Sequence, residues 1–266
     1  MLNGTVVSKQ RFPSPNPHVL LHIVEYMVDG LRVKGLLAEP VANGRYDGFL
    51  YLRGGIKSVG MVRVGRIVQF ASEGFVVMAP FYRGNQGGEG NEDFAGEDRY
   101  DALSALGVLE QHSKVDKDNI HVFGFSRGGV MALFVAELSD TVRSLVLWGG
   151  VTDMVLTYNE RKDLRRMMKR VIGGSPNKVP EAYKWRTPLY EVNQISCPVL
   201  LIHGVHDENV SVQHAYKLEE ELKKLNHTYE AWYFEGFTHY FPPRENRRIV
   251  HSLTSWMKKH SSLSQV

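Results

Sequence analysis

The sequence contains little that would place it outside ordinary globular proteins. Its 266 residues include one cysteine, Cys197, which excludes an intramolecular disulfide and fits a reducing compartment. Because Cys197 precedes Pro198 at the start of an apolar run, we expect it to be a small buried side chain. No apolar run approaches the length of a membrane span, and no secretory-signal pattern opens the chain. We therefore expect a soluble, cytoplasmic protein without membrane contact.

The chain also lacks a strong charge of either sign. Its formal net charge is +3, and no Lys/Arg block is interleaved with aromatic residues, so the composition argues against a nucleic-acid partner. The densest basic stretch is "RKDLRRMMKR", residues 161–170. We interpret it as the solvated face of a helix, with a membrane-surface or partner-binding role as the alternative. The sequence does not indicate an oligomeric state.

The apolar residues follow an alternation of strands and helices. Two apolar runs, 18–28 and 31–40, are joined by Asp29 and Gly30, a strong signal for a hairpin. Further strand patterns cover 46–55, 75–84, 119–126, 142–150, 198–204 and 228–236, and helix patterns cover 60–75, 98–113, 127–139, 212–226 and 244–260. Short apolar strands separated by helices predict a mostly parallel sheet covered on both faces, and hence one three-layer α/β domain over 1–266.

The alternation is interrupted once, over residues 151–195, after the sixth predicted strand. This segment holds a charged helix pattern and no low-complexity linker. We interpret it as a short helical insertion over the carboxyl edge of the sheet, where ligands bind in such folds. It is therefore a candidate lid or pocket wall. An ordinary connecting pair of helices explains the segment equally well.

One short motif carries most of the chemical information. Residues 124–128, "GFSRG", satisfy G-x-S-x-G and lie where a strand pattern ends and a helix pattern begins. The string alone is weak, but this context is the one that a nucleophile elbow requires. Glycines at 124 and 128 remove the Cβ atoms that would collide as the helix folds back on the strand. We therefore predict Ser126 as a nucleophile; the alternative is an inert serine in a glycine-rich turn.

A serine nucleophile needs a base and an acid that orients the base. With the elbow on an α/β sheet, the order along the chain is Ser, then Asp or Glu, then His. Asp207 follows the strand pattern 198–204, and His239 follows the strand pattern 228–236. We predict Asp207 as the acid and His239 as the base, with Asp153 as a rival for the acid.

Other histidines lie close to Asp207 in the sequence. His203 and His206 stand in "HGVHD", which superficially resembles a metal cluster. The H-E-x-x-H arrangement is absent, so we expect loop-shaping histidines and no metal. His214 falls inside a helix pattern, and we expect it at the surface.

Stabilising a tetrahedral oxyanion takes two N–H donors. One is expected from the backbone of Arg127, directly after the nucleophile. The other is expected from the turn "LRGGI", through the N–H of Gly55, with Ile56 as the near alternative. The glycine-rich segment 83–90 lacks the Gly-Lys-Ser/Thr of a nucleotide-binding loop, so we expect no cofactor and interpret the segment as pocket floor beside Ser126.

These motifs together resemble the catalytic domain of the prolyl oligopeptidase family of serine peptidases (family S9), which has the α/β-hydrolase fold. The resemblance runs in order through "RGG", "YRGNQGGEGNEDF", "GFSRGG", "TPLYEV", "HGVHDENV" and "FEGFTHYF", from the first parallel strand to the last helix. It implies a catalytic triad of Ser126, Asp207 and His239, in agreement with the residue pattern. It implies a small-molecule or short-peptide substrate.

The chain also departs from the family pattern around the site. Arg53 stands where many relatives have His before the two glycines, Ile56 stands where many have Pro, and Arg127 stands where an aromatic residue is common. We expect Arg53, Ile56 and Tyr82 to contact substrate. The basic residues of the insertion, with Arg53 and Arg127, suggest an acidic or carboxylate-bearing substrate. About 40 residues precede the first parallel strand, too few for the β-propeller of larger relatives. A carboxylesterase, or a binding protein without turnover, therefore stands beside the peptidase as an alternative.

Overall fold

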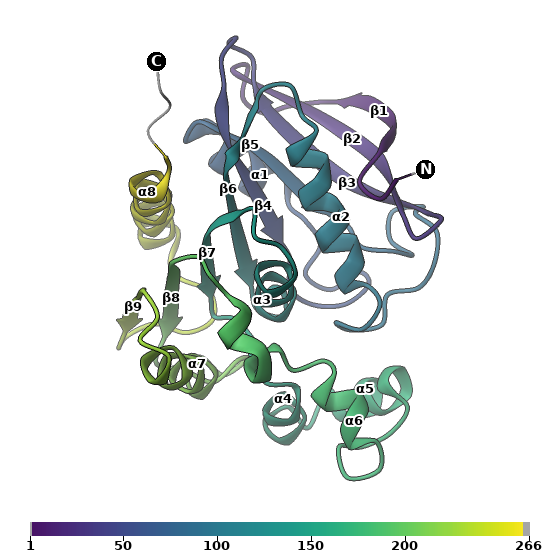
Figure 1. Ribbon diagram of the computed structural model, residues 1–266, viewed down its shortest axis with the longest axis vertical. Helices are drawn as coiled ribbons and strands as arrows, with labels where there is room; N and C mark the ends of the chain where they lie inside the picture. Colours follow the sequence, from purple (N-terminus) through teal and green to yellow (C-terminus); the bar gives the residue numbers. More distant parts are fainter. Residues whose placement is uncertain (1, 263–266) are drawn as a thin grey trace.

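The computed structural model describes residues 2–262, which form a nine-stranded sheet between layers of helices (Figure 1). The spatial order of the strands is β1-β2-β3-β5-β4-β6-β7-β8-β9. The strands are β1 (Val6–Phe12), β2 (Val19–Val28), β3 (Leu31–Pro40), β4 (Tyr46–Leu52), β5 (Phe75–Pro80), β6 (Val115–Phe125), β7 (Val142–Trp148), β8 (Val199–Gly204) and β9 (Tyr229–Phe234).

The amino-terminal part of the sheet is antiparallel. Strands β2 and β3 pair in register from Val28 opposite Leu31, and Asp29 and Gly30 both have positive φ, as a two-residue hairpin turn requires. The predicted hairpin is confirmed. Strand β1 was not predicted; it pairs with β2, and nearly all its residues are exposed. The helical insertion consequently follows the seventh strand of the structure rather than the sixth.

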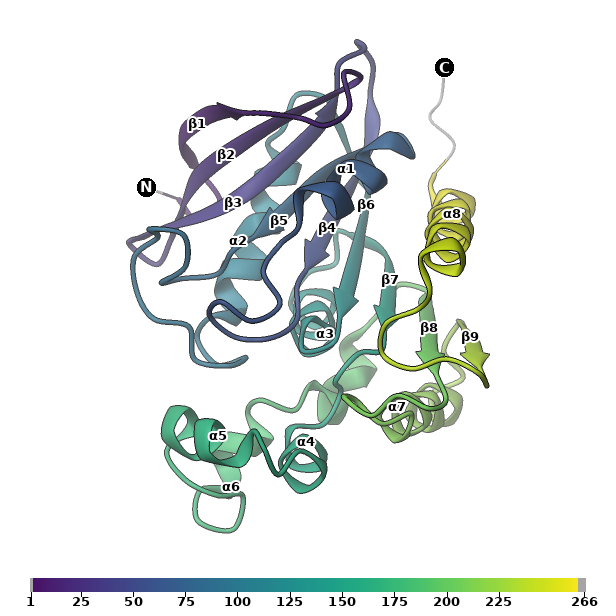
Figure 2. The same ribbon diagram turned by 180° about the vertical axis from the view of Figure 1, so that it is seen from behind.

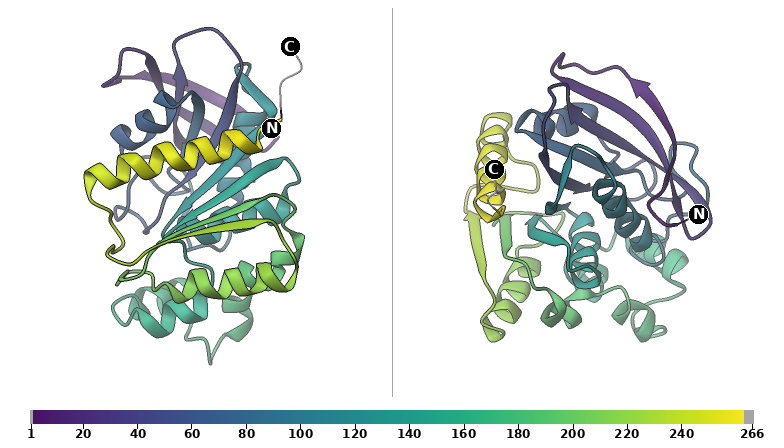
Figure 3. Two further views of the ribbon diagram at one scale, coloured as in Figure 1. Left: turned by 90° about the vertical axis from the view of Figure 1, so that its left-hand side faces the viewer. Right: turned by 45° about the horizontal axis from the view of Figure 1, so that its top comes forward.

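Strands β4 to β9 are parallel, and helices cover both faces of the sheet. Helices α1 and α8 lie on one face, and α2, α3 and α7 lie on the other (Figures 2 and 3). In β4, Phe49 faces the α1 and α8 layer whereas Leu50 faces the α2 and α3 layer, so the strand is apolar on both sides. The helices are α1 (Val64–Ser72), α2 (Arg99–Glu110), α3 (Gly128–Leu138), α7 (Gln213–Lys224) and α8 (Pro243–His260).

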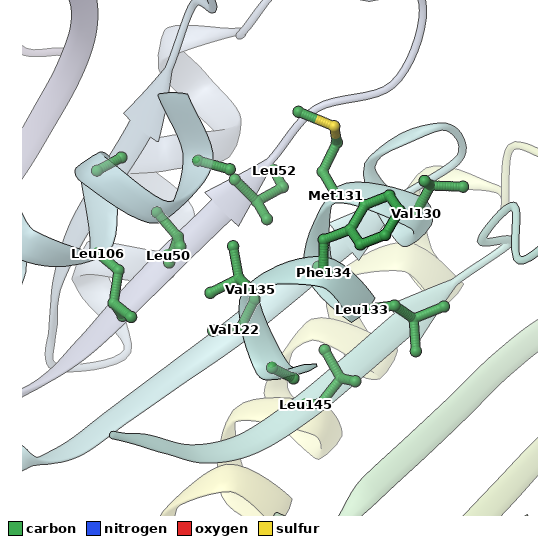
Figure 4. Packing of buried hydrophobic residues seen from close by; sticks show 14 of the residues in the cluster. Leu50, Leu52, Leu106, Val122, Val130, Met131, Leu133, Phe134, Val135 and Leu145 are labelled. Carbon is green, nitrogen blue, oxygen red and sulfur yellow. The ribbon is translucent and has the colours of Figure 1, made fainter. Parts of the chain in front are cut away.

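Helix α3 is the central helix of its layer. Its residues from Gly128 to Ala136 are all buried, so the helix is apolar around its whole circumference. Figure 4 shows Leu133 and Val135 of this helix among side chains of the sheet, including Val122 and Leu145. This packing fixes the first turn of α3, and therefore the position of the serine that precedes it.

The interruption predicted after the "VRSLVLWGG" strand is helical. It contains α4 (Met154–Glu160), α5 (Arg165–Ile172), α6 (Pro180–Lys184) and the 3₁₀ segment η1 (Pro188–Gln194). Helices α4, α5 and α6 lie beyond the ends of the strand arrows (Figures 1 and 2). The basic stretch 161–170 is not one solvated helix, because α4 ends at Glu160, α5 begins at Arg165, and Met168 is buried.

Cys197 is buried as predicted, and burial raises the pKa of its thiol to about 12. None of the helices within residues 2–262 combines the length and apolarity that a membrane span requires.

Glu137, near the end of α3, provides a pH-dependent test of the packing between α3 and η1. Burial, reinforced by the nearby Glu191 carboxylate, raises the pKa of Glu137 to about 9. Because the folded state binds this proton more tightly than the unfolded chain, the stability that the proton supplies is complete below about pH 4 and is lost as the pH rises towards 9. Glu137→Gln removes this loss, so we expect the stability of the wild type relative to the variant to fall with pH, by on the order of 1 kcal/mol per pH unit.

Urea unfolding of both proteins at several pH values between about 5 and 9 measures the difference. The exposed Glu110→Gln is the matched control, and its free energy of unfolding should run parallel to the wild type across the range. A constant gap between Glu137→Gln and wild type would show that Glu137 ionises in the folded protein as it does in water.

Candidate active site

Ser126 lies in a sharp turn between the last residue of β6, Phe125, and the first residue of α3, Gly128. Its φ is 57°, a left-handed conformation that costs a non-glycine residue on the order of 1–3 kcal/mol. The Ser126 carbonyl accepts hydrogen bonds from the N–H groups of Gly129 and Val151, each at 2.9 Å. Its neighbours therefore hold the serine in this strained conformation.

The two glycines of the motif are required by close approach of the backbone. A Cβ on Gly124 would overlap the carbonyl group of Gly128, as predicted for a helix that folds back on its strand. A Cβ on Gly128 would instead overlap the carbonyl group of Leu52, at the end of the neighbouring strand β4. The second glycine thus serves the packing of the turn against β4 rather than the fold of the turn alone.

Asp207 and His239 lie side by side, in the loops after β8 and β9. The Oδ2 atom of Asp207 is hydrogen-bonded to Nδ1 of His239 at 2.7 Å. Its Oδ1 atom accepts the N–H groups of Asn209 and Val210, each at 2.9 Å. Both side chains are buried. The three hydrogen bonds fix the carboxylate, and the carboxylate in turn orients the imidazole.

The rival acid Asp153 has other partners. Its Oδ1 atom caps α4 by accepting the N–H groups of Val155 and Leu156, and its Oδ2 atom lies 2.6 Å from Nζ of Lys217. Asp153 therefore fixes the start of the insertion, whereas Asp207 is hydrogen-bonded to His239.

Two further histidines near the site, His203 and His214, are buried and have structural roles. His203 is buried, with its Nε2 atom 2.9 Å from the carbonyl oxygen of Val210, in keeping with a loop-shaping role. The expectation that His214 lies at the surface is wrong. Its side chain is 1% exposed, the N–H of Thr152 donates to its Nδ1 atom, and burial lowers its pKa to about 3. His214 is consequently a neutral group that joins α7 to the start of the insertion.

The "LRGGI" turn lies against the nucleophile. A Cβ built on Gly54 would come within 2.6 Å of the Cβ of Ser126, so the backbone of this turn passes directly beside the serine. Within residues 2–262, the N–H groups of Arg127, Gly55 and Ile56 donate to no other residue. Free N–H groups beside a serine can stabilise a negatively charged oxygen.

Behind the turn lies a buried charge network that the sequence did not reveal. Glu92, with a fully buried side chain, accepts hydrogen bonds from the guanidinium groups of both Arg53, at 3.1 Å, and Arg127. Arg127 also pairs with Asp98 at 3.0 Å. Burial opposes ionisation of Glu92, but the charges of Arg127 and Arg53 outweigh it and hold the pKa of Glu92 below its ordinary value. The network is thus composed of paired charges.

This pairing corrects two predictions about substrate contacts. Arg53 is 1% exposed, and Tyr82 is fully buried with its ring near the guanidinium groups of Arg53 and Arg127, so neither side chain reaches a substrate. The guanidinium groups of both arginines are paired with Glu92, and that of Arg127 is also paired with Asp98. They consequently give no reason to expect an acidic substrate.

A pocket of about 270 Å³ opens over the serine. Ser126, His239, Gly55 and the predicted contact residue Ile56 all line it. Further lining residues come from the turn after β4, from α1 and from the insertion, including Arg63, Arg66, Val151, Thr157, Arg161, Leu164 and Met167. The insertion therefore forms part of the pocket wall.

The predicted pocket floor, segment 83–90, lies elsewhere. Among the described residues, none of 83–90 lines the pocket, and Arg83 instead pairs with Asp101 of α2 at 2.8 Å. The segment that follows contributes Phe94 to the lining and Glu92 to the charge network.

Comparison with known proteins shows which family has this architecture. The family model described as "Prolyl oligopeptidase family" matches residues 62–264. The chain belongs to the prolyl oligopeptidase family. That membership confirms the resemblance predicted from the motifs, and it makes the protein a serine hydrolase, a peptidase or an esterase.

Relatives in the prolyl oligopeptidase family differ in length. The chain is 68% identical to the uncharacterized peptidase YtmA of Bacillus subtilis, over 95% of this chain and 99% of that protein. It is 23% identical to dipeptidyl-peptidase 5 of Porphyromonas gingivalis, over 82% of this chain but 34% of that protein. The chain thus spans nearly all of the first relative and about a third of the second.

Solved structures confirm the α/β-hydrolase fold of this prolyl oligopeptidase family member. The acylaminoacyl peptidase of Pyrococcus horikoshii superposes with a TM-score of 0.78 at 18% identity, over 98% of this chain and 43% of that one. Acetyl xylan esterase 1 from Thermoanaerobacterium superposes with a TM-score of 0.76 at 15% identity, over 96% of this chain and 88% of that one. The same fold is therefore found in both a peptidase and an esterase.

Proposed function

We propose that this protein hydrolyses peptide or ester bonds of small substrates through a catalytic triad of Ser126, His239 and Asp207. The observation that carries the proposal is the 2.7 Å hydrogen bond between Asp207 and His239, in a pocket lined by both His239 and the strained Ser126. A serine held in a nucleophile elbow beside an oriented imidazole is the arrangement that acyl transfer requires.

In the proposed reaction, Ser126 Oγ attacks the substrate carbonyl carbon while Nε2 of His239 accepts the hydroxyl proton. The N–H groups of Arg127 and Gly55 donate to the resulting oxyanion. His239 then gives its proton to the leaving amine or alcohol, and an acyl-enzyme remains. Water attacks the acyl-enzyme through the same groups, which releases the acid and restores the Ser126 hydroxyl.

Asp207 has an orienting role in this scheme. Its Oδ2 atom accepts the Nδ1–H of His239, which leaves Nε2 free to act as the base. The N–H groups of Asn209 and Val210 fix the other oxygen, so the carboxylate cannot rotate away. The negative charge of Asp207 also stabilises the imidazolium that forms after proton transfer.

Peptide bonds are the first candidate substrates because the chain belongs to a peptidase family and is similar to YtmA. Ester bonds are the second, because an acetyl xylan esterase shares the fold over 88% of its own chain. We treat residues 1–266 as one hydrolase domain in which the insertion, 151–195, walls the pocket. Parallel kcat/KM values for 4-nitrophenyl esters and for acyl-aminoacyl anilides separate the two candidates.

A fluorophosphonate probe tests the nucleophile without knowledge of the substrate. Ser126 Oγ is expected to displace fluoride from phosphorus, so that one probe is attached per chain, on the peptide containing residues 124–128. Ester or anilide hydrolysis should fall in proportion to labelling, because the modified serine cannot attack a second substrate.

Peptide mass spectrometry identifies the labelled residue, and heat-unfolded protein serves as the control that should not react. Labelling confined to other serines, or full hydrolysis by completely labelled protein, would contradict the proposal.

A further inference from the structure

Two arginines of the pocket have no compensating charge. Arg63, which directly precedes α1, and Arg66, in its first turn, both line the pocket beside Ser126. Arg66 donates to the neutral side chains of Gln69 and Asn246, and Arg63 is exposed. Within residues 2–262 neither forms an ion pair, and no aspartate or glutamate lines this pocket. The pocket therefore carries a net positive charge near α1.

The other arginines of the lining do not contribute to this charge. Arg127 is buried and paired with Glu92 and Asp98. Arg161 lies 2.7 Å from the carboxylate of Asp163. The positive charge available to a ligand is consequently that of Arg63 and Arg66.

Arg66 lies towards the segment that follows His239, and its guanidinium donates to Asn246 in the first turn of α8. The guanidinium of Arg66 is 5.7 Å from the ring of Trp148, which packs at 4.9 Å against Phe241, two residues after His239. The lining residue Tyr51 interacts electrostatically with both arginines. Burial raises the pKa of Tyr51, and the positive charges of Arg66 and Arg63 oppose that rise.

The contacts of Arg66 with the side chains that pack against the His239 segment bear on which part of a substrate the arginines face. In the proposed mechanism His239 gives its proton to the leaving group, so the leaving group must lie on the histidine side. Apolar lining for the acyl part is available on other segments, at Phe94 and at the insertion residues Val151, Leu164 and Met167.

We propose that Arg63 and Arg66 bind a carboxylate carried by the leaving group of the substrate, an inference that rests on the proposed hydrolysis at Ser126. Guanidinium groups bind carboxylates through paired, charge-assisted hydrogen bonds. The substrate class is thus a short acyl compound whose departing half keeps a free carboxylate, such as a carboxyl-terminal amino acid or a carboxylate-bearing alcohol.

Matched esters test the proposal. 4-Acetoxybenzoate carries a carboxylate on its leaving group, and methyl 4-acetoxybenzoate is its neutral counterpart. Replacing both arginines by glutamine is expected to lower kcat/KM for the first about tenfold or more and to change that for the second by less than about twofold. Raising the salt concentration should reduce the wild-type preference for the anionic ester.

Three controls keep the result specific. Arg247→Gln removes one arginine charge from the exposed face of α8, outside the pocket lining, and should leave both rates unchanged. Arg66→Lys keeps the charge and should retain most of the preference, which guards against a packing defect where Arg66 meets Trp148. Mono-4-nitrophenyl glutarate, with its carboxylate on the acyl side, should be insensitive to the double replacement.

The assignment is overturned if the double replacement lowers kcat/KM equally for the neutral and anionic benzoates, or lowers it selectively for the glutarate. Binding separates this failure from failure of the proposed function, because it needs no turnover. The affinity of wild-type protein for 4-hydroxybenzoate should exceed that of the double variant at least about fivefold. Equal affinities overturn the carboxylate site even if Ser126 is the nucleophile, and unequal affinities support it even if another residue performs hydrolysis.

Discussion

Ser126→Ala is expected to lower kcat by about 10⁴- to 10⁶-fold, the loss seen when the nucleophile of a serine hydrolase is removed. Without Oγ no acyl-enzyme can form, and the residual rate comes from oxyanion stabilisation and substrate binding alone. Alanine keeps the Cβ of serine in the same strained conformation, so the free energy of unfolding should change little. Steady-state hydrolysis of a 4-nitrophenyl ester measures the first effect, and urea unfolding measures the second.

Ser139→Ala, just after the opposite end of α3, is the matched control and should keep wild-type activity. Hydrolysis by Ser126→Ala within tenfold of wild type would assign the reaction to another group. A folded but inactive Ser126→Ala protein, alongside an active Ser139→Ala protein, is the outcome that the triad requires.

Glu92→Gln is expected to destabilise the protein by about 3–5 kcal/mol, because it leaves two buried guanidinium groups short of a counter-charge. Glu92 accepts hydrogen bonds from Arg53, Arg127, Asn85 and the N–H of Lys57. A glutamine amide supplies one oxygen in place of two and adds N–H donors that face donors. Unfolding in urea, with the midpoint and slope measured separately, gives the free-energy difference.

The exposed Glu97→Gln, five residues along the same segment, makes the same chemical change at the surface and should cost less than about 0.5 kcal/mol. A loss below about 1 kcal/mol for Glu92→Gln would mean that solvent or rearranged neighbours replace its charge. Because Glu92 holds Arg127, directly after the serine, and the N–H of Lys57, two residues after Gly55, a folded Glu92→Gln protein should also show a lower kcat.

Features with a local cause could be predicted from the sequence. Asp29 and Gly30 adopt positive φ at a hairpin, and a serine framed by glycines lies where a strand becomes a helix. The loops of Asp207 and His239 could be placed together because carboxyl ends of parallel strands meet at one edge of a sheet. Each of these inferences depends on a few adjacent residues or on a general rule of topology.

Features that depend on distant partners could not be predicted. Arg53 and Glu92 are 39 residues apart, and nothing near either one indicates that their charges meet. From the sequence, the charges of Arg53 and Arg127 are therefore predicted to be available to a substrate, whereas Arg63 and Arg66 stand in an ordinary helix pattern. Likewise, burial of His214 depends on which face of α7 the root of the insertion covers.

The exposed strand β1 was missed for a different reason. Its sequence, "VVSKQRF", has no buried face, since nearly every residue is exposed, and it is held by pairing with β2. Backbone pairing at a sheet edge leaves little trace in a hydrophobic pattern.

The anchoring of the insertion limits where it can bend. The N–H of Val151 is hydrogen-bonded to the carbonyl of Ser126, Thr152 is bonded to His214, and Asp153 is bonded to Lys217. At the other end, the carbonyl of Ile195 is hydrogen-bonded to His227. Any pivot that lets α4, α5 and α6 swing must therefore lie between Asp153 and Ile195. Such a swing would widen the entrance while the first residue of the insertion stays tied to the nucleophile.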